Sequence, residues 1–216
     1  MSHPRIALIH ALAHSVEPIN AELARAWPEA IRMNLLDDSL SADLAREGRG
    51  LDEAMHHRFE VLAAYAESTG AQAILFTCSA FGPCIEAVAA RRPHMPVLKP
   101  NEAMVADVTG VEGPVGLIAS FAPTLVSMPP EFPAAVILRT ALVEEAMQAL
   151  NRGDVSVHDA LVVQAACDLV SGGCRAIALA QFSMARAAPA VAEATGVPVF
   201  TTPGSAVVRL RRQLGA

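Results

Sequence analysis

Cys78 is the residue whose type and setting point most directly to chemistry. It lies in FTCSAFGP, residues 76–83, where an apolar run ends and a group of small residues begins. The stretch CSAFGPCIEAVAARR predicts a helix, with Ser79 as a capping residue and Pro83 in the first turn. Because the positive end of a helix dipole favours a thiolate, we expect Cys78 to be a reactive base or nucleophile.

A second copy of the same pattern lies in the other half of the chain. Residues 70–81, GAQAILFTCSAF, align without a gap with residues 173–184, GCRAIALAQFSM, at an offset of 103. In this alignment Gln181 matches Cys78. An amide offers hydrogen-bond donors and an acceptor but does not titrate near neutral pH. Two-thiol chemistry is therefore excluded at these positions, unless another group replaces the missing thiol.

The elements that must position these residues are short apolar runs that alternate with helical patterns. The runs are RIALIH, IRMNLL, AILFTC and PVLKP, then VGLIAS, AAVILR, AIALAQ and PVFTTP. This alternation is typical of parallel sheets with helices on their faces. We predict an α/β protein of two pseudo-symmetric lobes, each a four-stranded, mainly parallel sheet flanked by helices. Lobe one is expected to comprise residues 1–98 and 203–216, and lobe two residues 99–202.

The ends of the predicted strands are where a ligand is expected. Ligands of parallel α/β sheets bind outside the carboxyl ends of the strands, and corresponding parts of the two lobes should face each other across a crevice. His10 ends the first run. Because histidine titrates near neutral pH, His10 is our candidate for the second catalytic acid or base. A structural hydrogen-bonding role for His10 is the alternative.

The order of these motifs resembles the aspartate/glutamate racemase superfamily, which also contains hydantoin racemases, maleate isomerases and arylmalonate decarboxylases. The motifs IALIHA, TCSAFG, GLIASFAPT and ALAQFSMA occur in family order. In such racemases two cysteines, one from each lobe, work as a paired acid and base, and the first matches Cys78. The second falls in ALAQFSMA, where this chain has Gln181. The chain is thus similar to a divergent, one-cysteine member.

The resemblance also implies how a substrate is held. Family members bind the substrate carboxylate through backbone amides and hydroxyls beside each cysteine and after the first strand of lobe two. The matching positions are Ser79, Ala80, Ser120, Thr124, Gln181, Phe182 and Ser183. Proton removal beside a carboxylate needs a base and donors for the developing charge, so no cofactor or metal is required where both are present. We expect a small carboxylate substrate and, as in many relatives, a homo-oligomer.

Composition narrows the class of partner. The net charge is −6 and the densest basic segments are RR at 91–92 and RLRR at 209–212, so we expect no nucleic acid. No stretch reaches the roughly 18 apolar residues of a membrane span, and we expect a soluble cytoplasmic protein. The four cysteines form neither a disulfide framework nor a zinc pattern, so Cys84, Cys167 and Cys174 are expected to be packing residues.

Three functions remain open. The first is cofactor-independent racemisation or isomerisation of a small amino acid or dicarboxylate through Cys78; cis–trans isomerisation by thiolate addition needs only one nucleophile. The second is decarboxylation of a malonate-type acid, in which one thiol protonates the carbanion. The third is a non-catalytic protein that binds a small acid. The decarboxylase branch keeps the lobe-two cysteine, whereas this chain keeps the lobe-one cysteine.

Overall fold

The structure, a computed structural model, describes residues 3–46 and 50–216 and divides into two compact units. Unit 1 comprises Met1–Pro100 and Ala206–Ala216, and unit 2 comprises Asn101–Ser205. Residues 1–2 and 47–49, which fall within the predicted lobe one, lie outside the described residues.

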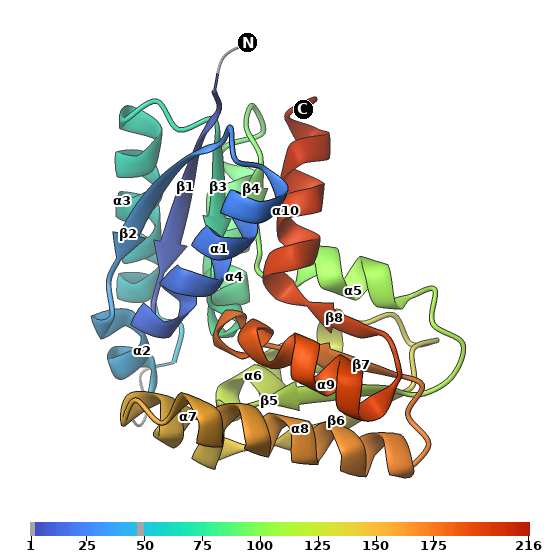
Figure 1. Cartoon of the computed structure of the whole chain (residues 1–216). Coiled ribbons are helices and arrows are strands. Elements are labelled where there is room, and N and C mark those ends of the chain that lie inside the picture. Colours follow the sequence, from blue (N-terminus) through green and yellow to red (C-terminus); the bar gives the residue numbers. More distant parts are fainter. Residues whose placement is uncertain (1–2, 47–49) are drawn as a thin grey trace. The chain divides into compact units, whose positions relative to one another are not determined.

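Each unit repeats a strand–helix order along the chain (Figure 1). The elements of unit 1 are β1 Arg5–His10, α1 Val16–Ala26, β2 Ile31–Leu36, α2 Ser39–Leu44, α3 Glu53–Ser68, β3 Ala73–Phe76, α4 Gly82–Ala90 and β4 Val97–Leu98. Unit 2 contains α5 Glu102–Val108, β5 Val115–Ala119, α6 Ala122–Ser127, β6 Leu138–Leu142, α7 Glu144–Asn151, α8 Val155–Ser171, β7 Ala176–Leu179, α9 Ala188–Thr195 and β8 Val199–Thr201. Helix α10, Thr202–Gln213, begins in unit 2 and ends in unit 1. Short 3-10 turns are η1 Ala13–Ser15, η2 Ser79–Phe81, η3 Pro129–Glu131 and η4 Phe182–Ala187.

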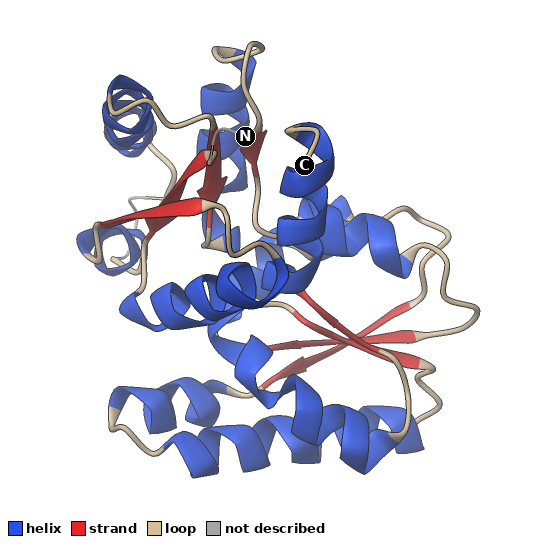
Figure 2. Ribbon diagram, turned by 45° about the horizontal axis from the view of Figure 1, so that its top comes forward, coloured by secondary structure: helices blue, strands red, loops and turns tan. Residues whose placement is uncertain are grey.

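Each unit is built on a four-stranded sheet whose strands are all parallel. The strand order is β2-β1-β3-β4 in unit 1 and β6-β5-β7-β8 in unit 2. Helices cover the faces of each sheet (Figure 2). The predicted α/β fold of two four-stranded lobes is therefore confirmed.

The same backbone hydrogen bonds recur in the two units, so the internal repeat is structural. The N–H of Thr77 donates to the carbonyl oxygen of Ile9 at 3.0 Å, and the N–H of Ala180 donates to that of Ile118 at 2.9 Å. These bonds join the ends of the first and third strands of each unit. The next residues are Cys78 and Gln181, which thus occupy equivalent positions.

The central strands β1, β3, β5 and β7 are continuous apolar runs because both of their faces are buried, whereas the edge strands β2 and β6 are largely exposed. In unit 2, alternate residues of β5 and β7 belong to two separate core clusters. One contains Leu117, Ala119, Ala176 and Ala178, with side chains of α5. The other contains Ile118, Ile177 and Leu179, with side chains of α8 and α9. Because successive side chains of β5 and β7 point into one or the other core cluster, polar site residues can lie only at the strand ends.

A buried ion network holds α4, the helix after Cys78, against α3. The guanidinium of Arg92 is 5% exposed and hydrogen bonds Glu60 at 2.7 Å and Glu67 at 3.0 Å. Hydrogen bonding to Arg92 lowers the pKa of the Glu60 carboxyl. Removing one partner of such a network leaves an uncompensated buried charge, so the network ties the C-terminal end of α4 to α3.

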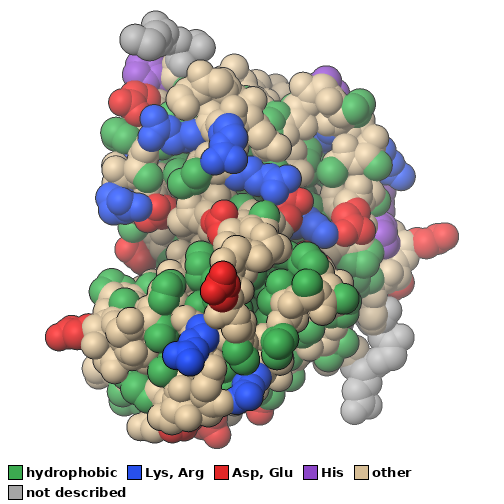
Figure 3. All heavy atoms as spheres, turned by 90° about the vertical axis from the view of Figure 1, so that its right-hand side faces the viewer, with side chains coloured by type: hydrophobic (Ala, Val, Ile, Leu, Met, Phe, Trp, Pro, Cys, Tyr) green, Lys and Arg blue, Asp and Glu red, His purple; other side chains and the backbone are tan. Residues whose placement is uncertain are grey.

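The surface mixes charged side chains of both signs with apolar ones. On the face shown in Figure 3, acidic side chains lie between the lysine and arginine side chains. Within the described part of the chain, no helix has the length and apolar character needed to cross a membrane.

Candidate active site

Cys78 lies directly after the carboxyl end of β3, in an extended conformation with φ −124° and ψ 119°. The 3-10 turn of Ser79–Phe81 separates it from α4. Pro83 occupies the first turn of α4, as predicted, but the N-cap residue is Phe81. The predicted capping role of Ser79 is wrong, because the intervening 3-10 turn moves the N-cap from position 79 to Phe81.

The environment of the Cys78 sulfur is predominantly apolar. Cys78 lines a narrow space of about 170 Å³ that has no room for a water molecule. The other lining residues are Ile9, His10, Ala11, Leu40, Phe59 and Phe76. Two of these residues, Phe59 and Phe76, stack with 5.2 Å between their ring centroids.

Burial controls the protonation of Cys78. It raises the pKa of the thiol to about 11, although hydrogen bonds with the Ala80 N–H and the Ser41 hydroxyl act in the opposite direction. This outcome is opposite to the expected dipole-stabilised thiolate. The reason is that desolvation of the charged form outweighs the helix end, which the 3-10 turn sets back. The resting side chain at neutral pH is therefore a neutral thiol.

His10 ends β1 and is completely buried. Its Nδ1 lies 2.9 Å from the Thr77 hydroxyl and its Nε2 lies 3.0 Å from Asn34 Oδ1. Asn34 Oδ1 also accepts from Asn20 Nδ2 at 2.8 Å, so it is the acceptor and His10 Nε2 carries the proton. Both ring nitrogens are engaged. Burial lowers the pKa of His10, and the Asn34 bond only partly opposes this effect.

The acid–base role expected of His10 finds no support in this geometry, which fits the structural alternative. A neutral imidazole with both nitrogens occupied has no free site for a substrate proton. Its bonds instead tie β1 to β2 through Asn34 and to Thr77, the residue before Cys78. His10 therefore positions the strand end that carries the thiol.

The buried His10 predicts a loss of stability at mildly acidic pH. Its folded-state pKa lies below the ordinary value of 6.5, so the unfolded chain binds the proton more readily. The contribution of the neutral His10 ring to the free energy of unfolding is complete above pH 6.5. It falls as pH decreases from there, by at most about 1.4 kcal/mol per pH unit. Urea unfolding between pH 5 and pH 8 measures this slope.

The matched comparison for this prediction is His10→Gln, which removes the titrating ring and keeps hydrogen-bonding capacity. The difference in unfolding free energy between wild type and variant is expected to shrink as pH falls below 6.5. A difference that stays constant over this range contradicts a lowered pKa for His10.

In unit 2, Ser120 and Gln181 form the equivalent strand-end cluster. Ser120 follows β5, and both its N–H and its hydroxyl donate to Gln181 Oε1, at 2.5 Å and 3.1 Å. The two residues are 2% and 8% exposed. Gln181 Nε2 has no hydrogen-bond partner among residues 3–46 and 50–216. This NH₂ group is thus a neutral donor held in a fixed orientation by Ser120.

The remaining candidate site residues of unit 2 differ in their burial and in their hydrogen bonding. The Phe182 side chain is fully buried and contributes packing. Thr124 is buried in α6. The Ser183 hydroxyl is buried and has no hydrogen-bond partner in the described residues. An unsatisfied buried hydroxyl is costly, so Ser183 retains unused bonding capacity beside Gln181.

Sequence reasoning missed three polar residues of these two clusters. Ser41 hydrogen bonds Cys78 and also donates to the Ala11 carbonyl at 2.8 Å, but it lies in a stretch whose composition resembles a solvated surface. Asn34 orients His10 from the neighbouring strand. Thr202, fully buried at the end of β8, has a hydroxyl without a partner among the described residues. We selected Gln181 because ligands bind outside the carboxyl ends of parallel strands, and the same reason selects Thr202.

The structure thus brings two pairs of the sequence-predicted residues together, His10 with Cys78 in unit 1 and Ser120 with Gln181 in unit 2. In unit 1, His10 and Cys78 line one space, with Ser79 and Ala80 in the following turn. Within the described residues, no group of three or more His, Cys, Asp or Glu side chains is placed to hold a metal ion. The chemistry of these clusters rests on one thiol and neutral hydrogen-bonding groups.

Solved structures with this architecture include several enzymes. Glutamate racemase isoform RacE1 of Bacillus anthracis is 15% identical with a TM-score of 0.77, over 100% of this chain and 83% of that chain. Allantoin racemase of Klebsiella pneumoniae is 20% identical with a TM-score of 0.70, over 98% of this chain and 88% of that chain. A glycine-to-cysteine variant of arylmalonate decarboxylase, in a sulfate-associated form, is 19% identical with a TM-score of 0.67, over 99% and 94%. These likenesses show the fold.

The family is shown by the sequence itself. A comparison with curated proteins gave no match. The sequence model of the family described as Asp/Glu/Hydantoin racemase matches residues 13–210, which include Cys78, Ser120 and Gln181. The match spans both units and nearly the whole chain. The chain therefore belongs to the Asp/Glu/Hydantoin racemase family.

Proposed function

We propose that the chain is a cofactor-independent isomerase that converts a small unsaturated dicarboxylate between its cis and trans forms through the Cys78 thiol. The observation that carries this proposal is that the equivalent positions after β3 and β7 hold residues of different chemistry. The end of β3 supplies a titratable thiol, and the end of β7 supplies an amide fixed by Ser120. Family membership supports racemase- or isomerase-type chemistry. An addition–elimination mechanism requires one nucleophile and no second base.

The proposed reaction uses the sulfur as a temporary substituent. After the thiol proton leaves to solvent, the thiolate forms a carbon–sulfur bond to one alkene carbon. The π electrons move onto the other carbon and its carboxylate. The former double bond then rotates as a single bond, and expulsion of the thiolate restores the alkene in the trans form.

The charge that develops on the carboxylate needs hydrogen-bond donors. In this proposal the groups beside Cys78, at Ser79 and Ala80, supply them. Support comes from the place of both residues in the turn that directly follows Cys78. In unit 2, Gln181 and Ser183 keep free hydrogen-bonding capacity among the described residues.

A second candidate function is decarboxylation of a malonate-type acid. A specific observation favours it, because burial raises the pKa of Cys78 to about 11 and so keeps the thiol protonated. In this reaction a carbon–carbon bond breaks, carbon dioxide leaves, and the electron pair stays on the substrate carbon. Cys78 then donates its proton to that carbon and regains one from water.

One experiment distinguishes the two candidate functions from each other and from their alternatives. The protein is incubated in deuterated water with maleate, a panel of amino acids and an arylmalonate, and the products are followed by proton NMR. We expect maleate to be converted to its trans isomer and the α-protons of the amino acids to be retained. Loss of carbon dioxide from the arylmalonate selects the lyase. Exchange of amino-acid α-protons contradicts the one-thiol proposal, and no conversion at all selects a non-catalytic binding protein.

The Gln181→Cys variant is the control for the amino-acid arm. It places a second thiol at the position equivalent to Cys78. If the residue at position 181 is what separates this chain from a two-thiol racemase, α-proton exchange appears in this variant and not in wild type. A folded variant without exchange contradicts that role of position 181.

A further inference from the structure

Among the described residues, Ser41 is the side chain that hydrogen bonds the Cys78 thiol. Ser41 lies in α2 and is 9% exposed. Its hydroxyl also donates to the Ala11 carbonyl at 2.8 Å. Ala11 and Leu40, the residue before Ser41, line the same narrow space as Cys78, which we call the thiol space. The hydroxyl and the sulfur thus meet beside a space that has no room for a water molecule.

One arginine of α3 holds α2 in place on both sides of Ser41. Arg58 bonds Asp37, which precedes α2, at 2.7 Å, and it bonds Asp43, near the end of α2, also at 2.7 Å. The next residue of α3, Phe59, lines the thiol space. The helix that forms part of the wall of this space therefore also fixes the helix that carries the hydroxyl.

The Ser41 hydroxyl can bond the neutral thiol and the thiolate in different ways. A serine hydroxyl has one proton to donate and lone pairs with which to accept. In the resting protein its proton is donated to the Ala11 carbonyl, so the oxygen is left to accept the S–H of Cys78. A thiolate has no proton and can only accept. To remain bonded to the thiolate, the hydroxyl must turn its proton from the carbonyl to the sulfur.

A Cys78 thiolate has few other sources of stabilisation. His10, which reaches the thiol space from β1, is neutral with both ring nitrogens engaged. Arg58 is paired with the two carboxylates on either side of Ser41. Burial and two hydrogen bonds, not a neighbouring charge, set the pKa of the thiol, and the second bond comes from the Ala80 N–H. A thiolate therefore depends on one backbone donor and on Ser41.

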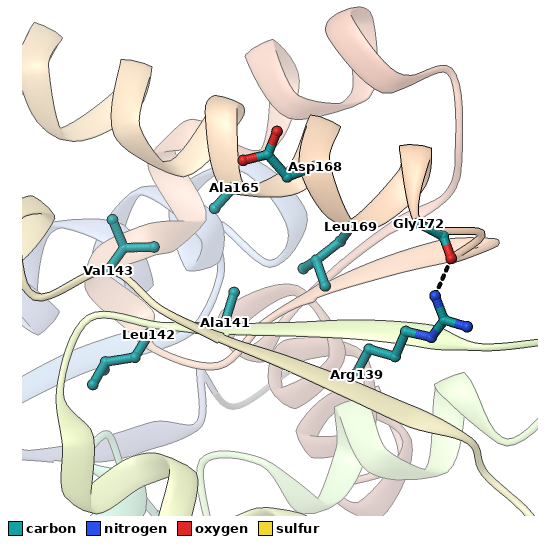
Figure 4. Close-up of a pocket in the computed structure, with 8 residues that line it drawn as sticks. All are labelled: Arg139, Ala141, Leu142, Val143, Ala165, Asp168, Leu169 and Gly172. Carbon is teal, nitrogen blue, oxygen red and sulfur yellow. Dashed lines mark hydrogen bonds between the residues drawn. The ribbon is translucent and has the colours of Figure 1, made fainter.

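A larger groove in unit 2 offers no alternative nucleophile. It lies between β6 and α8 and has a volume of about 360 Å³. Its two charged residues, Arg139 and Asp168, lie apart in Figure 4, and Arg139 donates to the Gly172 carbonyl. None of the described residues that line this groove carries a thiol, hydroxyl or imidazole group. The groove therefore has no side chain that could take over the part of Cys78.

We propose that Ser41 positions and stabilises the Cys78 thiolate by turning its hydroxyl from the Ala11 carbonyl to the sulfur. The inference rests on the proposed function, in which this thiolate attacks the substrate. In this step the thiol proton leaves to solvent, Ser41 keeps its own proton, and the sulfur keeps the electron pair of the former S–H bond. Because a hydrogen bond to an ionised group is about twice as strong as a neutral one, the new bond favours the thiolate.

The test is the rate at which iodoacetamide alkylates Cys78 in the full chain between pH 8 and pH 10. The thiolate displaces iodide, so the rate follows the thiolate fraction, and peptide mass spectrometry measures each cysteine separately. Ser41→Thr and Ser41→Val have the same shape and differ in the hydroxyl. We expect Ser41→Thr to react as wild type does. Ser41→Val is expected to react about tenfold more slowly at each pH, which corresponds to a rise of about one unit in the pKa of the thiol.

Two controls separate the hydroxyl from a general loosening of α2. Ser39→Ala removes the other serine of α2, whose hydroxyl donates to Asp37 at 2.5 Å, and is expected to leave the alkylation of Cys78 unchanged. Cys167 on α8, measured in the same samples, is expected to react at one rate in all variants. Equal Cys78 rates in Ser41→Thr and Ser41→Val overturn the proposal, as does an equal slowing in Ser39→Ala. Circular dichroism verifies folding, and where the branched variants do not fold, Ser41→Ala against wild type gives the same comparison.

The alkylation result does not depend on turnover, because no substrate is present. If maleate is not converted but Ser41→Val slows alkylation, the role of Ser41 stands and the proposed reaction fails. If maleate is converted and the two variants are alkylated equally, the reaction stands and the role of Ser41 fails. If both hold, kcat/KM for maleate is expected to be about tenfold lower in Ser41→Val than in Ser41→Thr.

Discussion

Replacing Cys78 with alanine is expected to abolish turnover and leave the fold intact. In both candidate reactions the sulfur forms the bond to substrate or donates the proton, and neither step has another titrating group in the two clusters. His10 is neutral with both nitrogens engaged, and Gln181 does not titrate. Loss of such a group typically costs on the order of 10³-fold or more in kcat. The rate of substrate conversion measures this loss.

The structural cost of Cys78→Ala should be small. Cys78 as a whole residue is only half-buried, although its sulfur faces the apolar space, and truncation removes a single sulfur atom. Cys167→Ala is the matched control, because Cys167 is also a partly exposed cysteine but lies on α8. This control is expected to retain wild-type turnover and thermal stability. Undiminished turnover in a folded Cys78→Ala protein removes Cys78 from both mechanisms.

The pH dependence of kcat/KM is expected to rise steeply above neutral pH if the protein is the proposed isomerase. The reacting form is the thiolate, and the pKa of Cys78 in the free protein is about 11. The thiolate fraction therefore increases about tenfold per pH unit, or about 10³-fold between pH 7 and pH 10. Initial rates across this range, with circular dichroism as a control for folding, measure the slope.

The decarboxylase candidate predicts the opposite profile. Its reacting form is the neutral thiol, so kcat/KM stays constant from pH 7 and falls only as pH approaches the Cys78 pKa of about 11. A flat profile for maleate conversion contradicts thiolate addition as the slow step. A profile that levels off near pH 8 contradicts the raised pKa of Cys78, because it requires a pKa close to that of an ordinary cysteine.

The repeat made the fold and the paired positions predictable. Apolar runs buried on both faces read as parallel strands, and the alignment of residues 70–81 with residues 173–184 corresponds to the same hydrogen bonds at Thr77 and Ala180. The strand-end rule then led to Cys78, Ser120 and Gln181. These inferences depend on local order along the chain, which a sequence displays directly.

The state of the side chains was less predictable because it depends on distant partners. His10 is bonded to Asn34 and Thr77, 24 and 67 residues away, and these bonds leave neither ring nitrogen free for a substrate proton. The pKa of Cys78 follows from Leu40, Phe59 and Phe76 around the sulfur, not from the adjacent helix start. Desolvation is a property of surrounding volume, and no local pattern encodes it.

By itself, the sequence determined the α/β class, the duplication, the family, and the equivalence of Cys78 and Gln181. Only the tertiary structure decided that the thiol is neutral and that Ser120 fixes the Gln181 amide from 61 residues away. The physical reason is the separation in the chain of the residues involved. A hydrophobic period can be recognised among residues close together in the sequence. Hydrogen bonding, burial and charge interactions join residues that are neighbours only in space.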